Sequence, residues 1–210
     1  MTEKNTGRRG RPVDPALHPK IVEVACELFN ELGFQATTMD KVAREAKISK
    51  LSIYKHFENK EALFSAAIAA RCQDLAPSSL FEGVKGTAEA QLLAVGNSLL
   101  SLLLSDDVRN METMIMSDTS NQVALSELFY EAGPQRFISQ IENLLRNLHE
   151  KQALSVPDPK QSARLFAALF KGSDLLYIAR FDPEVAQRDE VISSYCRSAV
   201  ALFLEAHRLS

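Results

Sequence analysis

Residues 50–57 form a short basic and aromatic segment whose side chains are suited to binding a polyanion. The segment reads Lys-Leu-Ser-Ile-Tyr-Lys-His-Phe. In a helix, the apolar Ile53 and Phe57 fall on one face and pack inward. The remaining side chains then point outward: Lys50, Leu51, Ser52, Tyr54, Lys55 and His56. A short helix with this surface suits the major groove of DNA. The alternative for Tyr54 and His56 is that their rings only cover the helical bundle.

The N-terminal segment offers a second candidate contact with DNA. Residues 7–12 read Gly-Arg-Arg-Gly-Arg-Pro and contain Arg-Gly-Arg-Pro, the core of the AT-hook. That motif lays an extended backbone and two arginines in the narrow minor groove of A·T-rich DNA, where the negative potential is enhanced. We therefore expect Arg9 and Arg11 to contact the minor groove; the alternative is a basic tail that is only solvated.

Apolar spacing predicts the helices that must position these side chains. The expected helices are Pro19–Leu32, Thr37 to near Lys47, Lys50–Phe57, and Asn59 to about Leu75. Gly33 is suited to end the first helix. Thr37 is expected to cap the second, with Asp40 three residues later as in a capping box, and Ser49 and Asn59 are expected to cap the third and fourth. The two short helices cannot be stable alone and must be held by packing.

The segment that holds these helices resembles the TetR family of bacterial one-component regulators. The matching residues keep fixed spacing from about Ile21 to Phe64: Ala25-x-x-Leu28-Phe29, Gly33-Phe34, Thr37-Thr38, Val42-Ala43-x-x-Ala46, Ile48-Ser49-Lys50, Ile53-Tyr54-Lys55-His56-Phe57 and Lys60-Glu61-Ala62-Leu63-Phe64. Family members are homodimers that place paired recognition helices in successive major grooves of a palindromic operator. They release DNA when a small molecule enters the C-terminal domain, and repression is the usual outcome.

The resemblance also implies roles for single residues. Thr37 and Thr38, near the start of the second helix, are both candidate DNA contacts, and the resemblance places a phosphate contact at Thr38. The positions on the recognition helix that meet bases and phosphates are Lys50, Ser52 and Tyr54. Two further residues, His56 and Lys60, fall where the DNA backbone is clamped.

Two residues depart from the common family pattern, because Lys47 and Leu51 stand where glycine is frequent. The turn at Lys47 is expected to need a positive φ, which costs a non-glycine residue on the order of 1 kcal/mol. Leu51 could pack against a thymine methyl group or be a partly buried residue at the helix start. The operator preference of relatives therefore cannot be transferred to this chain.

The rest of the chain is also predicted to be helical, which gives an all-α fold with a small N-terminal helix-turn-helix unit and a larger C-terminal bundle. The expected helices are Thr87–Ser105, Asp107–Asp118, Val123–Gln152 with a kink or split at Gly133-Pro134, Pro159–Arg180 and Pro183–Leu209. We divide the chain into a basic arm (1–15), a DNA-binding domain (16–60) and a ligand-binding and dimerisation domain (61–210). By analogy with the family, the last two helices form the dimer interface.

The sequence specifies the effector site less closely than it specifies the DNA-binding residues. Candidate lining residues are Met111, Met114, Phe129, Phe137, Phe170, Asp174 and Tyr177. Thioether side chains suit adaptable ligand surfaces, but the methionines could equally fill a core. Asp174 stands alone in an apolar stretch and could bind a cationic ligand, face solvent or pair with an arginine at an interface.

Composition limits the remaining possibilities. Apolar residues make up 46% of the 210 and charged residues 24%, as in ordinary globular proteins. Residues 1–60 hold 11 Lys/Arg against 8 Asp/Glu, whereas the other 150 residues hold 13 against 19, so the basic end is expected to face a polyanion. No apolar run is long enough to span a membrane and no signal peptide is visible, so we expect a cytoplasmic protein.

The other function classes have weaker support in the sequence. Cys26, Cys72 and Cys196 are far apart, which argues against a disulfide framework or a zinc site, and the alternatives are buried side chains or an oxidant-sensing thiol. No metal, cofactor or catalytic residue is expected, because no phosphate loop, HExxH motif or nucleophile elbow appears. The remaining alternative is an all-α scaffold or small-molecule-binding protein that does not recognise DNA sequence. The basic arm and the lysines of residues 50–60 argue against it.

Overall fold

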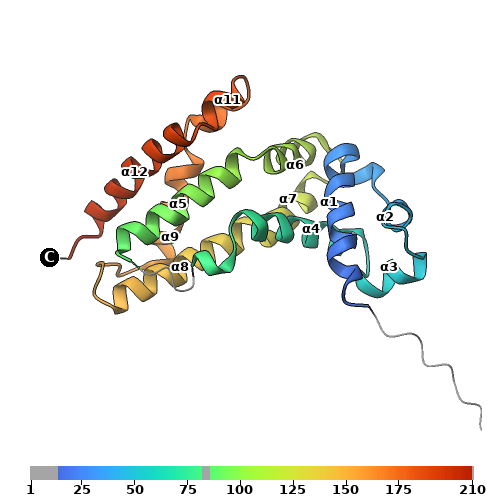
Figure 1. Ribbon diagram of the computed structural model, residues 1–210, viewed down its shortest axis with the longest axis horizontal. Helices are drawn as coiled ribbons and strands as arrows, with labels where there is room; N and C mark the ends of the chain where they lie inside the picture. Colours follow the sequence, from blue (N-terminus) through green and yellow to red (C-terminus); the bar gives the residue numbers. More distant parts are fainter. Residues whose placement is uncertain (1–13, 82–85, 210) are drawn as a thin grey trace, which may run out of the picture.

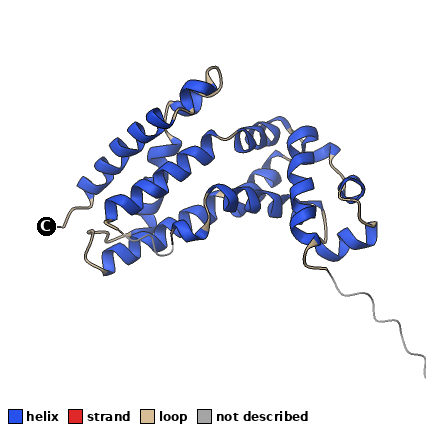
Figure 2. Ribbon diagram, viewed as in Figure 1, coloured by secondary structure: helices blue, strands red, loops and turns tan. Residues whose placement is uncertain are grey.

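A computed structural model describes residues 14–81 and 86–209, and all regular secondary structure within them is helical (Figure 2). The helices are α1 (Leu17–Ala36), α2 (Met39–Glu45), α3 (Lys50–His56), α4 (Lys60–Leu75), a 3-10 turn (Ser78–Leu80), α5 (Ala88–Leu104), α6 (Asp106–Ser117), α7 (Gln122–Ala132), α8 (Pro134–Glu150), α9 (Pro159–Lys171), α10 (Leu175–Ile178), α11 (Pro183–Ala186) and α12 (Asp189–Ala206). The predicted all-α class is confirmed. The arm residues Arg9 and Arg11 lie outside the described residues.

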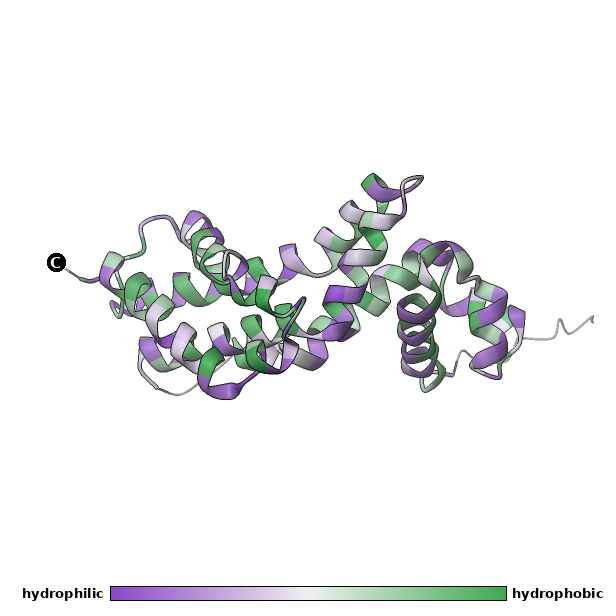
Figure 3. Ribbon diagram, turned by 90° about the horizontal axis from the view of Figure 1, so that it is seen from above, coloured by the Kyte–Doolittle hydropathy of each residue, from purple (hydrophilic) through white to green (hydrophobic). Residues whose placement is uncertain are grey.

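Helices α1 to α3, which we call the head, lie at one end of an elongated molecule, and the C-terminus lies at the other (Figure 1). α4 leads from the head into the body, which we define as α5 to α12. In the body, hydrophobic residues face the interior of the bundle and polar residues face outward (Figure 3). The DNA-binding candidates and the C-terminal helices therefore occupy opposite ends.

Side-chain caps set the starts of the short head helices. Ser49 accepts a hydrogen bond from the Ser52 amide and Asn59 accepts one from the Ala62 amide, as expected for N-caps. The cap of α2 is Thr38, which accepts from the Lys41 amide at 3.2 Å, so the prediction that Thr37 caps this helix is wrong by one residue. Gly33 adopts φ 79°, which interrupts the helical backbone of α1 where the sequence predicted its end.

The C-terminal helices are more broken than predicted. The helix expected over Pro159–Arg180 ends at Lys171, and a four-residue α10 follows. Gly172 closes α9, and the Ser173 hydroxyl accepts the Leu175 amide, which replaces the helical pattern there. The helix expected over Pro183–Leu209 is likewise split into α11 and α12. The break at Gly133-Pro134 separates α7 from α8 as expected.

Two hydrophobic cores hold the molecule together. The first joins the head to α4, α6 and α7, and its centre is a set of aromatic rings in which Phe29 lies 5.8 Å from Phe34 and 5.1 Å from Phe64. The second fills the body. Because Leu63, Phe64, Ala67 and Ile68 of α4 belong to the first core, the boundary we placed at residue 60 falls inside a shared core rather than in a linker.

Phe170 shows how closely the body core is packed. A methyl group added at Gly96 of α5 would lie 2.6 Å from the edge of the Phe170 ring, so only glycine fits opposite this ring. As for membrane insertion, no single helix among the described residues is long and apolar enough to cross a bilayer. α5 and α6 meet such criteria only when taken together, and they are bent by 53° at the break between them.

Candidate DNA-binding surface and effector cavity

The surface of α3 has the inward and outward division that the sequence predicted. Ile53 is fully buried in the head core and anchors the helix. Leu51 is 68% exposed and Tyr54 45% exposed. Lys50 and Lys55 are also exposed, while Ser52 and His56 are half-buried. Leu51 is therefore a surface residue rather than a partly buried one, and α3 presents an apolar side chain between basic and hydroxyl groups.

Lys50 has an acidic partner that the sequence reading missed. Its Nζ lies 2.8 Å from Oδ2 of Asp40, which is in the first turn of α2. The hydrogen bond that Lys50 donates to Asp40 and the negative charge of Asp40 raise the pKa of Lys50. Both side chains are exposed, so the pair contributes little to folding. The pair affects any contact with DNA, because Asp40 competes with a phosphate or a base for the Lys50 ammonium group.

The two threonines before α2 have different structural roles. Thr37 is completely buried, and its hydroxyl donates toward the carbonyl oxygens of Leu28 and Gly33 at 3.0 and 2.8 Å. Its side chain therefore fastens the end of α1 and is not available to a phosphate, so we withdraw Thr37 from the candidate DNA contacts. Thr38 is exposed at the N-terminus of α2, where helix amides favour an anion.

Lys60, which was predicted to contact the DNA backbone, also makes two contacts within the protein. Its Nζ donates a hydrogen bond to the Phe34 carbonyl at 2.8 Å and lies 4.1 Å from the centre of the Phe34 ring. Partial burial lowers the pKa of Lys60. The side chain thus ties the start of α4 to the end of α1. Replacing Lys60 would disturb this contact as well as any contact with DNA.

His56 has a ring neighbour in α1 that the sequence did not reveal. His18 lies 4.8 Å from the Phe57 ring and 6.1 Å from the His56 ring, measured between ring centres. The first turn of α1 therefore packs against the end of α3. A residue from the start of α1 therefore supports the end of α3, and only the folded structure shows this contact.

The turn between α2 and α3 requires a backbone conformation that suits glycine. Lys47 has φ 56°, which confirms the positive φ expected at this position. We predict that Lys47→Gly raises the free energy of unfolding by about 0.5–1 kcal/mol, since glycine removes the strain of the left-handed conformation but adds freedom to the unfolded chain. Urea or thermal unfolding would measure this. Lys151 has an ordinary φ of −79°, and Lys151→Gly is expected to give no gain; equal gains at both sites would contradict the argument.

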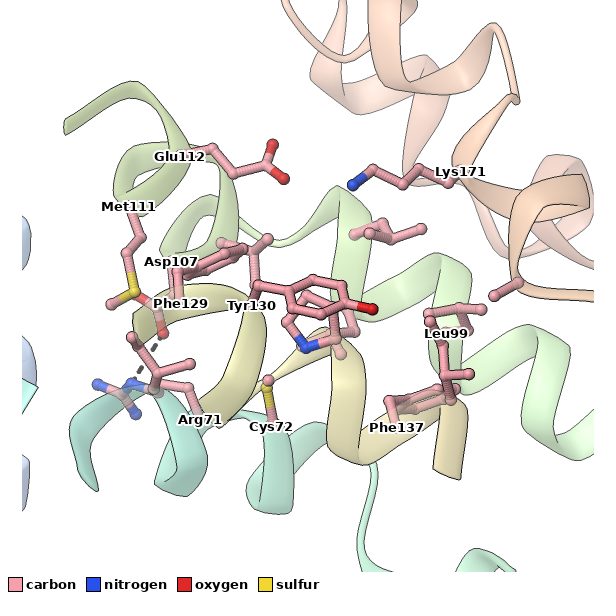
Figure 4. A pocket seen from close by; sticks show the side chains of 18 residues that line it. Arg71, Cys72, Leu99, Asp107, Met111, Glu112, Phe129, Tyr130, Phe137 and Lys171 are labelled. Atoms are coloured by element: carbon pink, nitrogen blue, oxygen red, sulfur yellow. Dashed lines mark ion pairs between the residues drawn. The ribbon is translucent and has the colours of Figure 1, made fainter. Parts of the chain in front are cut away.

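A cavity of about 140 Å³ opens in the body between α4, α5, α6, α7, α8 and α9 (Figure 4). Its walls are mainly apolar and include the predicted residues Met111, Phe129 and Phe137. The other predicted residues lie elsewhere. Met114 packs against the head core, Phe170 is enclosed in the body core, and Asp174 and Tyr177 are exposed. These four positions do not line the cavity. The packing of α6 on α1 turns Met114 away, Asp174 and Tyr177 follow the break after Lys171, and the Phe170 ring faces Gly96 of α5.

A charged pair and an asparagine connect three helices at the cavity. Arg71 Nε on α4 lies 3.1 Å from Asp107 Oδ2 on α6, and both residues line the cavity (Figure 4). The other carboxylate oxygen of Asp107 accepts a hydrogen bond from Asn30 Nδ2 on α1 at 2.8 Å. Asp107 therefore joins the cavity directly to the head. The sequence offered no signal for this group, since its members are 36 to 77 positions apart.

Two more charged residues stand at the mouth of the cavity. Glu112 on α6 and Lys171 on α9 extend toward each other in Figure 4. Glu112 is half-buried and Lys171 is exposed, and within the described residues they do not come close enough to form an ion pair. The cavity lining thus carries two basic and two acidic side chains, Arg71, Lys171, Asp107 and Glu112.

The three cysteines are unfavourably placed for thiolate chemistry. Burial raises the pKa of Cys26 and of Cys196 to about 11, and it raises that of Cys72, which lines the cavity. These thiols stay protonated at neutral pH, and the thiolate is the reactive form. The structure therefore favours the interpretation of buried side chains over that of an oxidant sensor.

The helices expected at a dimer interface have both buried and exposed apolar side chains. Phe166, Phe170, Ala199 and Phe203 are buried in the body core. Leu165 of α9 and Leu202 of α12 remain more than half exposed, as do Tyr177 and Phe181 around α10. α9 and α12 also pack against each other. Their outward apolar side chains are the ones left for a partner.

Two family models match the chain, one near its N-terminus and one over its C-terminal part. Residues 21–67 match the family described as "Bacterial regulatory proteins, tetR family", and residues 90–208 match "AefR-like transcriptional repressor, C-terminal domain". The uncharacterized HTH-type transcriptional regulator YdeS of Bacillus subtilis is 29% identical over 193 residues, which cover 92% of this chain and 90% of that protein.

Solved structures resemble the chain over nearly its whole length. The flavonoid-responsive regulator FrrA superposes with a TM-score of 0.73 at 25% identity, over 93% of this chain and 98% of the other. A TetR-family regulator from Mesorhizobium loti superposes with a TM-score of 0.72 at 21% identity, over 92% and 98% of the two chains. Family and neighbours are transcriptional regulators, not enzymes. The chain therefore belongs to the TetR family of bacterial transcriptional regulators.

Proposed function

We propose that this protein is a repressor that binds a palindromic DNA operator as a homodimer and releases it when a small molecule enters the body cavity. The observation that carries the DNA-binding part is the surface of α3. A helix anchored by the buried Ile53 exposes Lys50, Leu51, Tyr54 and Lys55 on its outer side. Lysine can bind guanine acceptors, and leucine can pack on a thymine methyl group.

The homodimer follows from the exposed apolar side chains at the other end of the molecule. Leu165, Leu202, Tyr177 and Phe181 would be covered by the same surfaces of a second copy, as an isologous interface requires. A symmetric dimer reads two half-sites, so the operator would be palindromic, with half-sites about one DNA turn apart or a multiple of it. The AefR-like match over residues 90–208 supports repression rather than activation.

Release by an effector is supported by the position of Asp107. This carboxylate lines the cavity and holds Asn30 of α1, so a ligand that shifts Asp107 would alter how the head sits on the body. A ligand weakens DNA binding only if it binds the DNA-free conformation more tightly. FrrA is described as flavonoid-responsive, which makes a small organic molecule a reasonable effector class here.

Selection from a random DNA library, followed by fluorescence titration, tests the proposal. We expect a palindromic consensus, and two protomers bound to each full site. Lys50→Ala and Leu51→Ala should each cost about 1–3 kcal/mol on the best site and change which bases are preferred. Lys151→Ala, an exposed lysine at the far end of α8, serves as the control and should leave affinity and preference unchanged.

Three results would contradict parts of the proposal. If selection yields no consensus, the chain is a helical binding protein that does not recognise DNA sequence. If the consensus is a single half-site bound by one protomer, the regulator stands but the homodimer does not. If Leu51→Ala leaves the consensus unchanged, base readout does not pass through this side chain.

A further inference from the structure

We infer that the body cavity binds a small, uncharged, largely apolar ligand of about one substituted benzene ring. This inference rests on the proposed function only in treating the cavity as the effector site. Three features of the cavity carry it: its volume, the chemistry of its walls and the pairing of its charges.

The volume limits the ligand to a small molecule. The cavity measures about 140 Å³. An apolar engineered cavity of roughly 150 Å³ stays dry and binds benzene. A single ring with one or two small substituents therefore fills this space, whereas a larger ligand would have to push the walls apart or extend through the mouth.

The walls favour an apolar and aromatic molecule. Leucines of α5, Met111 of α6 and the rings of Phe129 and Phe137 line the cavity (Figure 4). Aromatic rings pair favourably with other rings, and a methionine thioether adapts to the ring edge. Tyr130 on α7 brings its hydroxyl to the same cavity and can form a hydrogen bond with one polar substituent.

The charges argue against an ionised ligand. Arg71 is within ion-pair distance of two carboxylates, Asp107 at 3.1 Å and Asp74 at 3.8 Å. Asp107 is also held by Asn30. An anionic ligand near Arg71 would also meet the negative charges of Asp107 and Asp74, and a cationic ligand near Asp107 would also meet the positive charge of Arg71.

The charges at the mouth balance each other as well. Glu112 and Lys171 extend toward each other, so a charged ligand group placed between them would be attracted by one and repelled by the other (Figure 4). Moving a charged group from water into an apolar cavity is strongly unfavourable, and the two basic and two acidic side chains of the lining give neither sign of ligand charge a net attraction. A neutral ligand avoids both costs and leaves the Arg71–Asp107 pair in place.

Three one-ring compounds of similar size test the inference: 4-methylphenol, which is neutral at pH 7.5, benzoate, which is an anion, and benzylammonium, which is a cation. Binding to the full-length protein would be measured by isothermal titration calorimetry and by the shift in melting temperature. We expect 4-methylphenol to bind at least about 10-fold more tightly than either ion and to raise the melting temperature as its concentration rises. Binding of benzoate or benzylammonium as tight as that of 4-methylphenol would overturn the inference.

A matched pair of variants locates the binding. Ala167 of α9 lines the cavity, while its neighbour Ala168 is exposed. Ala167→Leu fills part of the space and should weaken 4-methylphenol binding at least about 10-fold, whereas Ala168→Leu should not change it. Unchanged binding in a folded Ala167→Leu variant contradicts the assignment.

A crystal of the wild-type protein soaked with 4-methylphenol gives the same answer without any variant. Electron density for the ring beside Phe129 and Phe137 supports the assignment, and density only at another site overturns it. Operator affinity is measured separately: if 4-methylphenol occupies the cavity but leaves DNA binding unchanged, the ligand class holds and the proposed effector response fails. If DNA binding is sequence-specific but no neutral ring binds, the regulator holds and this inference fails.

Discussion

Phe29→Ala is expected to lower the free energy of unfolding by about 3–5 kcal/mol, because it removes a whole ring from a packed core. Phe29 has no exposed surface, and its ring packs against both Phe34 and Phe64. The cavity left behind is lined by rigid neighbours that can collapse only in part. Since domains of this size are typically stable by only about 5–15 kcal/mol, the variant would lose a large share of its stability.

Urea unfolding followed by circular dichroism measures this loss, and Leu51→Ala provides the control. Leu51 is a large apolar residue of the same head but is 68% exposed, so its removal should change stability by less than about 0.5 kcal/mol. Because α6 and α7 share the core of Phe29, the loss should appear in the main unfolding transition rather than in an early melting of the head alone. A change below about 1 kcal/mol for Phe29→Ala would contradict the packing described.

Raising the salt concentration from 50 to 200 mM is expected to weaken operator binding by about 10³-fold or more. In the proposed complex, each protomer brings Lys50, Lys55, Arg9 and Arg11 to DNA, which gives about eight cations per dimer. Each cation that neutralises a phosphate releases condensed counterions, and that release becomes less favourable as salt rises. Fluorescence anisotropy at several salt concentrations gives the slope, and a nearly flat dependence would rule out a set of phosphate contacts.

Asp40→Asn tests whether the ion pair on the free protein opposes DNA binding. Without the Asp40 carboxylate, Lys50 is no longer occupied before DNA arrives, and one negative charge is removed beside the DNA-facing surface. We expect tighter binding, because the carboxylate no longer competes for Lys50 and no longer repels the DNA backbone. Glu150→Gln, which removes an exposed charge at the end of α8, should leave the affinity unchanged. Equal affinities of Asp40→Asn and the wild type would mean that Asp40 does not compete with DNA for Lys50.

The features that the sequence predicted are those determined by neighbouring residues along the chain. Helix periodicity, the caps at Ser49 and Asn59 and the break at Gly133-Pro134 depend on a few adjacent side chains and on backbone geometry. The positive φ at Lys47 could be expected because the family pattern often has glycine there. The outward face of α3 also followed, since the helical repeat fixes which residues lie opposite Ile53.

The misplaced helix boundaries depend on local competition between side chains and backbone groups for hydrogen bonds. Thr37 looked like a cap of the second helix, but it directly follows α1 and its hydroxyl donates to the carbonyls of Leu28 and Gly33 in that helix. The long C-terminal helices looked continuous because their apolar spacing is regular, yet Gly172 and the Ser173 hydroxyl stop α9. Periodicity reports which residues are apolar, and it does not report where a side chain competes for a backbone hydrogen bond.

The proposed recognition surface is thus largely determined by the sequence, because it lies on one short helix whose register is local. The contacts that connect this surface to the rest of the molecule depend on tertiary structure. Asp40 meets Lys50 across a turn, Lys60 meets Phe34 across two helices, and Arg71, Asp107 and Asn30 meet from α4, α6 and α1. The cavity has walls from six helices, so its volume and its balanced charges exist only once those helices have packed. The spacing of residues along the chain does not predict these contacts, because the packing of the two buried cores brings the side chains together.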